Sequence, residues 1–267
     1  MKKLANLYLV LVMLFLYVPI FVLIVFSFNE SKSRSVFSGF TLDWYARLFH
    51  NDIIISSLMN TIIIAVLTSI ISTILGTLAA IGINSMRKVP KAVVMNITNM
   101  PIINPEIVTG VSLMLLFVFF AARMNLEFGF VTLLLAHITF DVPYVILNIM
   151  PKFKQMDPHL YEAAQDLGCS PFQAFKKVIL PEIMPGIVSG FLIAFTYSLD
   201  DFVISYFTSG STSQTLPITI YSMTRRKISP EINALSTLIF LVVVIVLIVK
   251  NIIETRAAKK NGTYMGA

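Results

Sequence analysis

Four carboxylates interrupt long apolar stretches of this sequence: Glu106, Asp141, Asp200 and Asp201. A charged side chain near the centre of a lipid bilayer costs roughly 2.5–3.5 kcal/mol on insertion scales, so it is expected to face protein or water and to have a use. A carboxylate in such a place can replace the water around a cation through charge-assisted hydrogen bonds, and aromatic faces add cation–π attraction. These acids therefore favour a passage for positively charged cargo.

Two of the acids are neighbours in the sequence, and helix geometry separates their roles. Adjacent residues on a helix point about 100° apart, so Asp200 and Asp201 cannot both face one pore axis unless the helix is distorted. Tyr197 lies four residues before Asp201, on the same helix face. We expect one aspartate to meet the cargo and the other to be anchored. The alternative is that both hold a subunit interface, through hydrogen bonds to Ser198 or Ser205.

The other two acids have structural explanations beside the functional one. Glu106 follows Pro101 and Pro105, where a helix is expected to kink, so it either lines the pathway or stabilises the kink. Asp141 lies four residues after His137, and these two side chains are expected to satisfy each other within one helix. The predicted substrate pathway therefore consists of Glu106, Tyr197, Asp200 and Asp201.

The elements that carry these residues are predicted to be membrane-spanning helices. Hydrophobic residues make up 57% of the 267 residues and charged residues 13%, whereas a soluble domain is nearer to about a quarter charged. A hydrocarbon core of about 30 Å requires roughly 20 helical residues. Six apolar runs are long enough: 7–28, 53–83, 93–122, 130–150, 187–207 and 234–253. The expected fold class is an all-α integral membrane protein of one domain, residues 1–267.

The positive charges predict which side of the membrane each loop occupies. The net charge is +6, and most Lys and Arg residues fall on the loops that share a side with the N-terminus. Because translocation of these residues is disfavoured, that side is expected to be cytoplasmic, and six spans then leave both termini there. The single cysteine, Cys169, excludes an internal disulfide framework and a thiolate metal cage. We expect no metal, no cofactor and no catalytic constellation.

One predicted cytoplasmic loop, residues 151–186, is far longer than the others. Asp157 predicts the start of a short helix, and Gly168 its end in a left-handed conformation. Ser170 repeats the starting signal, and a second short helix is expected to run to about Ile179 before Pro181 ends it. The alternative to this compact docking surface is a loop that lies on the membrane. The residues expected to be exposed near its elbow are Leu160, Ala163, Ala164, Leu167 and Phe172.

The same loop carries a family motif. Glu162-Ala163-Ala164, then Gly168, then Val178-Ile179-Leu180-Pro181, resembles the EAA loop of permeases of ATP-binding-cassette importers, with Val178 where an isoleucine is usual. In that family the loop forms the coupling helix that sits in a cleft of the ATPase subunit. The resemblance implies this role for Glu162, Ala163, Ala164, Gly168, Leu180 and Pro181. The chain has no G-x-x-x-x-G-K-S/T phosphate loop, so ATP would be bound by a partner and the chain itself is not expected to be an enzyme.

Further stretches resemble the permeases of spermidine/putrescine importers. They are residues 26–29, 41–45, 104–108, 137–140, 198–205, 217–218, 221–223 and 229–234. The resemblance implies the six-helix, MetI-like permease fold of type I importers, a place in the bacterial cell membrane and a polyamine cargo. It also implies three kinds of protein partner: two copies of a cytoplasmic ATPase, a second homologous permease, and an extracytoplasmic substrate-binding protein. Membrane lipid is a further partner, and nucleic acid is not.

Two alternatives stay open. The same family resemblance would accommodate a permease for iron, thiamine or a sugar, although the acidic and aromatic fifth span favours a cation. A stand-alone secondary transporter would often show paired inverted repeats and broken helices around a midplane site, and the sequence shows neither. The docking loop therefore favours the ATP-coupled importer.

Overall fold

The computed structural model describes residues 2–31, 36–124, 127–226, 230–241, 244, 245 and 248. These residues form helices and connections, with no strand among them beyond an isolated bridge between Asn29 and Phe40. The chain divides into two compact units, Met1–Ile55 with Ile220–Ala267, and Ser56–Thr219. The candidate site lies entirely within the second unit.

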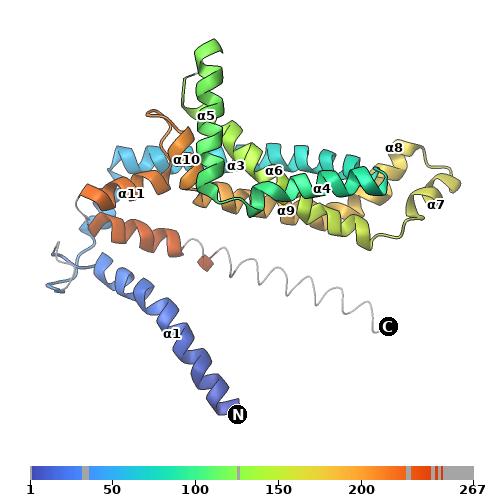
Figure 1. The fold of residues 1–267 in the computed structure, drawn as a ribbon. Coiled ribbons are helices and arrows are strands. Elements are labelled where there is room, and N and C mark those ends of the chain that lie inside the picture. Colours follow the sequence, from blue (N-terminus) through green and yellow to red (C-terminus); the bar gives the residue numbers. More distant parts are fainter. Residues whose placement is uncertain are drawn as a thin grey trace. The chain divides into compact units, whose positions relative to one another are not determined.

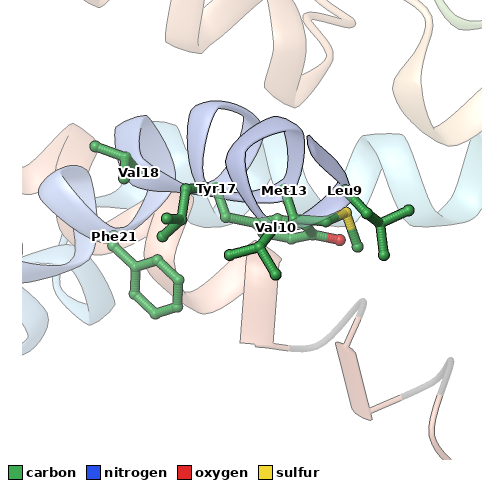
Figure 2. Close-up of a pocket in the computed structure, with 7 residues that line it drawn as sticks. Leu9, Val10, Met13, Tyr17, Val18 and Phe21 are labelled. Atoms are coloured by element: carbon green, nitrogen blue, oxygen red, sulfur yellow. The ribbon is translucent and has the colours of Figure 1, made fainter. Parts of the chain in front are cut away.

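The first unit begins with α1 (Lys2–Ser27), a helix that is apolar on all sides. Figure 2 shows a hollow of about 390 Å³ that follows this helix, and its labelled lining residues are Leu9, Val10, Met13, Tyr17, Val18 and Phe21. One helix supplies the whole lining. Among the lining residues, Tyr17 alone has an ionisable side chain, and the lining contains no carboxylate. The hollow is therefore a surface for lipid or for another apolar helix, and not a ligand cavity.

A short second helix, α2 (Asp43–Phe49), is tied to the end of α1. The indole N–H of Trp44 donates a hydrogen bond to the carbonyl oxygen of Asn29 at 2.7 Å. The hydroxyl oxygens of Ser27 and Tyr45 are also hydrogen-bonded, 2.7 Å apart. Trp44 is buried by this arrangement, so its first role is to hold the connection between the two helices.

The remaining labelled helices lie in the second unit, except that the first residues of α3 and most of α11, from Ile220 on, belong to the first. They are α3 (Asp52–Asn84), α4 (Lys88–Ile103), α5 (Glu106–Met124), α6 (Phe130–Gln155), α7 (Leu160–Asp166), α8 (Pro171–Ala174), the π-helical turn η1 (Phe175–Ile179), α9 (Leu180–Asp200), α10 (Val203–Thr208) and α11 (Leu216–Arg226). Figure 1 shows their order along the chain.

Five described helices are long and apolar enough to cross a membrane. They are Asn6–Ser27, Asp52–Asn84, Glu106–Arg123, Phe130–Gln155 and Pro171–Asp200, and they overlap the first five predicted spans. The predicted sixth span, 234–253, lies largely outside the described residues, where only the shorter apolar helix Pro230–Leu241 overlaps it. The all-helical, multi-pass membrane architecture expected from composition is confirmed.

The predicted third span, 93–122, is wrong as a single helix. The chain leaves the helical conformation at Asn104 (φ −68°, ψ 139°), so α4 ends at Ile103 and α5 begins at Glu106. Pro105 explains the break, because its ring drives the preceding residue into an extended conformation and it has no N–H to donate. Figure 1 shows α4 and α5 leaving this break in different directions. Glu106 is thus the first residue of a helix, where a carboxylate interacts favourably with the helix dipole.

The predicted fifth span, 187–207, also differs from the structure. It is interrupted after Asp200, because Asp201 is extended (φ −63°, ψ 125°) and a separate helix begins at Val203. At its other end the helix starts earlier than expected. Pro181 does not end it: the chain stays helical through the π-helical turn Phe175–Ile179 directly before Leu180, where the regular i→i−4 hydrogen-bond pattern is already interrupted. The expected second short helix therefore continues through η1 into α9.

Helices α6 and α9 pack closely along their length and run antiparallel. Gly186 of α9 approaches the carbonyl oxygen of Asn148, where an added Cβ would lie 2.9 Å away, and Gly190 approaches Val145. The apolar core formed here also includes residues of α3 and η1. Its buried members are Ala80, Ile83, Val145, Ile146, Ile149, Met150, Phe153, Ile179, Ile183 and Ala194.

Candidate functional site

A pocket of about 290 Å³ lies where α5, α6 and α9 meet. All four residues predicted to form the substrate pathway line it, although they come from two helices and a helix break. The complete lining is Glu106 of α5, Phe140 and Tyr144 of α6, Tyr197 and Asp200 of α9, and Asp201, Phe202 and Val203 from the break and the start of α10. The structure therefore brings the predicted residues together in one place.

Three aromatic rings form one wall of the pocket. The ring centroids of Tyr144 and Tyr197 are 4.6 Å apart in an edge-to-face arrangement, and those of Phe140 and Tyr144 are 5.2 Å apart. Phe140 and Tyr197 complete the cluster at 6.2 Å. The electron-rich faces of such rings attract cations. Phe140 and Tyr144 were not predicted as site residues, although their spacing of four residues places both on one face of α6.

The two adjacent aspartates have different environments. The side chain of Asp201 is 6% exposed and accepts hydrogen bonds from the backbone N–H groups of Ile204, at 3.2 Å, and Ser205, at 2.6 Å. It thereby satisfies N–H groups in the first turn of α10 that the short helix leaves unpaired. Asp200 is exposed at the end of α9. Asp201 is therefore the anchored member of the pair.

Two carboxylates stay available in the pocket. Neither Glu106 nor Asp200 forms a hydrogen bond or an ion pair with any residue that the structure describes, and both are exposed. They approach the pocket from different helices, α5 and α9. Carboxylates in this state are acceptors only, so their chemistry suits a ligand that carries N–H donors and positive charge.

A buried polar cluster lies behind Asp201. His137 of α6 is 2% exposed and is hydrogen-bonded through Nδ1 to the hydroxyl of Ser198, at 2.7 Å. Its Nε2 is 3.0 Å from the hydroxyl of Ser205 and 3.5 Å from the Asp201 carboxylate. The prediction that His137 and Asp141 satisfy each other within α6 is therefore wrong. His137 faces α9, the break after it and α10, since these supply all three of its polar contacts.

The long predicted loop forms a compact surface made of α7 and α8. Gly168 has a φ of +85°, which confirms the expected left-handed turn between the helices. Ser170 caps α8 by accepting a hydrogen bond from the Gln173 N–H at 3.3 Å, while the Gln173 side chain accepts one from the Ser170 N–H. At the other end Asp157 accepts a bond from the N–H of His159, so α7 begins slightly later than expected.

The motif residues of this surface do not all face outward. Glu162 and Ala163 are exposed, and Leu167 and Phe172 are 87% and 72% exposed on either side of the turn. Ala164, however, is only 6% exposed, so the expectation that it is exposed is wrong. A small side chain there lets α7 pack closely against its neighbours, α8 and η1. Leu180 and Pro181 lie in the first turn of α9.

Comparison with known proteins places the chain in a family. Residues 72–259 match the family described as binding-protein-dependent transport system inner membrane component. The spermidine/putrescine transport system permease protein PotC of Haemophilus influenzae is 39% identical over 86% of this chain and 88% of its own length. The putrescine transport system permease protein PotI of Escherichia coli K12 is 39% identical over 88% of this chain and 85% of its own.

Solved structures share the fold at low sequence identity. A bacterial ABC transporter involved in the import of alginate aligns over 95% of both chains, with a TM-score of 0.69 and 15% identity. The alginate transporter in complex with a pentasaccharide-bound periplasmic protein aligns over 93% of this chain and 91% of its own, with a TM-score of 0.72 and 17% identity. The chain belongs to the family of inner membrane components of binding-protein-dependent transport systems and has the MetI-like fold of an ABC importer permease.

Proposed function

We propose that this chain is the permease subunit of an ATP-driven importer and that its cargo is a polyamine, spermidine or putrescine. The observation that supports a polyamine cargo is the composition of the pocket. In it, Glu106 and Asp200 have no partner among the described residues, and three aromatic rings form one wall. The names of the relatives, spermidine/putrescine and putrescine permeases, support the same cargo.

The chemistry of the pocket matches a cation with several charges. Each ammonium group of a polyamine loses water when it enters a confined passage, and a carboxylate compensates by a charge-assisted hydrogen bond. Two separate carboxylates, Glu106 and Asp200, can compensate two ammonium groups. The rings of Tyr144 and Tyr197 offer cation–π attraction and cover the methylene chain between the charges. A neutral sugar would leave both carboxylates without a counter-charge.

We assign different roles to the four predicted pathway residues. Asp200, Glu106 and Tyr197 contact the cargo in this proposal. Asp201 acts indirectly, because its hydrogen bonds to Ile204 and Ser205 hold the break that ends α9 at the pocket. Without that break the helix would continue and Asp200 would lie within a regular span.

The second part of the proposal concerns coupling to ATP. We assign docking on the ATPase to loop 151–186, with Glu162, Ala163 and Gly168 at the contact. Leu167 and Phe172 add exposed apolar surface beside the turn, which is suited to burial against a partner. Ala164, Leu180 and Pro181 support the loop from within instead, since Ala164 is buried and the other two belong to α9.

The proposed assembly contains two copies of the ATPase, a second homologous permease and an extracytoplasmic binding protein. The whole chain, 1–267, would act as one permease domain in the bacterial cell membrane, with both termini in the cytoplasm. Loop 151–186 then faces the ATPase, and ATP hydrolysis belongs to that subunit rather than to this chain.

Reconstitution of the complete importer in proteoliposomes tests the cargo. ATP-dependent uptake of labelled spermidine is expected, and excess unlabelled putrescine should compete with it because both present ammonium groups to the same carboxylates. Thiamine and maltose should not compete. Uptake of thiamine or maltose in place of spermidine would overturn the proposed cargo while leaving the importer fold unaffected.

A further inference from the structure

A carboxylate outside the pocket has no partner at all among the described residues. Asp141 of α6 is fully buried, with 0% exposure, and neither of its carboxylate oxygens accepts a hydrogen bond from any residue that the structure describes. Burial of a polar group is costly unless it is hydrogen-bonded, and burial of a charge is costlier still. A carboxylate kept in such a place calls for a partner that another state of the transporter supplies.

Asp141 lies on the face of α6 that packs against α9. The antiparallel contacts of these helices pair Val145 with Gly190 and His137 with Ser198. Asp141 lies one turn from both Val145 and His137, and Ala194 lies one turn from both Gly190 and Ser198. Asp141 is therefore opposite Ala194, which is itself fully buried. The α9 residues in line with Asp141, namely Gly190, Ala194 and Ser198, all have small side chains.

A third helix, α3, approaches the same stretch of α6. The Ser72 hydroxyl is 3.5 Å from the carbonyl oxygen of Ile138, three residues before Asp141. Further along, Gly76 lies so close to α6 that an added Cβ would be 3.3 Å from the carbonyl oxygen of Val142. Asp141 thus belongs to a junction of α3, α6 and α9.

Other polar atoms of α3 also have no hydrogen-bond partner among the described residues. The hydroxyl oxygens of Thr68 and Thr73, which flank Ser72 on α3, are buried and have no hydrogen-bond partner among the described residues. At the contact of α3 with α6, the Ser72 hydroxyl and the Ile138 carbonyl lie one turn or less from the unpaired Asp141 carboxylate along α6, so oxygen atoms gather in this part of the apolar core. An ammonium group, with three donors and no acceptor, is complementary to such oxygens.

The junction is close to the cargo pocket along α6. Phe140 and Tyr144, which precede and follow Asp141, both line the pocket and belong to its aromatic wall. Asp141 itself is not among the lining residues. A cation in the pocket would therefore reach Asp141 only after the rings part and α9 moves away from α6.

We propose that Asp141 forms a second cation site, which receives an ammonium group of the cargo after the pocket and when α9 has moved relative to α6. This proposal rests on the polyamine cargo proposed above. The pocket, with Asp200 and Glu106, makes the first contact, and Asp141 offers the next carboxylate along the passage. The alternatives are a neutral, permanently protonated Asp141 and a purely structural one, and the experiment separates both from the proposal.

The test uses the complete importer in proteoliposomes and measures kcat and KM for spermidine uptake. Asp141→Asn keeps the shape but removes the charge, so kcat is expected to fall roughly ten- to hundredfold. Because Asp141 is not reached at the first contact, KM should stay at the wild-type value. Asp141→Glu restores the charge and should recover part of kcat. Thr139→Val, an exposed position on the same helix, is the matched control and should transport normally.

The melting temperature of the purified complex completes the test. Asp141→Asn is expected to leave it unchanged or to raise it, since a buried unpaired charge has been removed. A wild-type kcat for Asp141→Asn would overturn the proposal. The neutral amide of Asn resembles a protonated carboxylic acid, so this result would mean that Asp141 stays neutral and does not bind a cation. Equal losses for Asn and Glu together with a lower melting temperature would also overturn it, in favour of a structural role.

Failure of this inference can be told from failure of the proposed cargo. If Asp200→Asn impairs spermidine uptake while Asp141→Asn does not, only the second site is wrong. If the wild-type importer does not take up spermidine at all, the polyamine cargo is wrong and the second cation site is overturned with it.

Discussion

The pocket and the docking loop use opposite chemistry. The pocket places carboxylates, Glu106 and Asp200, among aromatic rings, whereas the loop presents Leu167 and Phe172 to its surroundings. Carboxylates recognise a cation through charge-assisted hydrogen bonds, and aromatic faces add cation–π attraction. Docking on a protein gains from apolar surface that becomes buried. The two regions therefore suit different ligands, a small cation and a folded partner.

A continuous helical segment joins the two regions. It runs from Pro171, in the docking loop, to Asp200, at the pocket, through 30 residues. At about 1.5 Å per residue this is roughly 45 Å, which exceeds the thickness of the hydrocarbon core. The π-helical turn Phe175–Ile179 lies within it, and such turns are frequent at functional sites. Movement of the docking loop would therefore be transmitted directly to the helix that carries Tyr197 and Asp200.

The largest expected effect comes from breaking the docking loop. Gly168→Val places a β-branched residue at φ +85°, a conformation that costs roughly 1–3 kcal/mol for residues other than glycine. We expect spermidine uptake to be lost while the protein still inserts and the ATPase still binds ATP. Uptake is measured in proteoliposomes, and copurification of the ATPase reports whether the subunits still associate.

Gly82→Val is the matched control for this change. Gly82 also has open space around its missing Cβ, but it lies within helix α3 and has no left-handed backbone. Its substitution should leave uptake and copurification near wild type. Normal uptake by Gly168→Val would remove the docking assignment from the loop.

The next effect separates the two aspartates of the pocket. Asp200→Asn removes a free carboxylate, so KM for spermidine should rise roughly ten- to hundredfold. Asp201→Asn weakens the hydrogen bonds that hold the start of α10, so the melting temperature should fall more than for Asp200→Asn. If both variants changed KM equally and neither changed the melting temperature, the assignment of Asp200 as the contacting residue and Asp201 as the anchored residue would be wrong.

The smallest effect is expected from the aromatic wall. Tyr144→Leu keeps apolar volume but removes the ring that contacts both Phe140 and Tyr197. A cation–π interaction of about 0.5–2 kcal/mol corresponds to a KM increase of roughly two- to thirtyfold. Phe191→Leu, an aromatic residue elsewhere on α9 that does not line the pocket, is the matched control. An equal effect of both changes on spermidine KM would assign the rings to packing alone.

Local signals in the sequence predicted two helix ends in loop 151–186 well. Gly168 ends one helix and Ser170 starts the next, and the structure contains both of these features. Such helix ends depend mainly on the residues beside them in the sequence. The direction of Ala164 could not be predicted in the same way. Its burial depends on how α7 packs against other helices, and small residues are equally common on exposed and buried faces.

The pocket was predicted only in part. Acids within apolar runs identified Glu106, Asp200 and Asp201, because charge in such places is rare. A kink near Pro105 was expected, but not the full break between α4 and α5, and the break after Asp200 was missed, since apolar composition continues through both. The partners of His137 were missed as well, because Ser198 and Ser205 come from other helices and helix periodicity carries no information on contacts between helices.

The central claim is that Glu106 and Asp200 together hold the cargo. Its most direct test is the KM for spermidine uptake by the complete importer that carries both Glu106→Gln and Asp200→Asn. The control is Asp52→Asn, because Asp52 is an acid at the start of α3 that does not line the pocket. The double variant should show a larger increase in KM than either single variant, while Asp52→Asn should match the wild type. A wild-type KM for the double variant would contradict the claim.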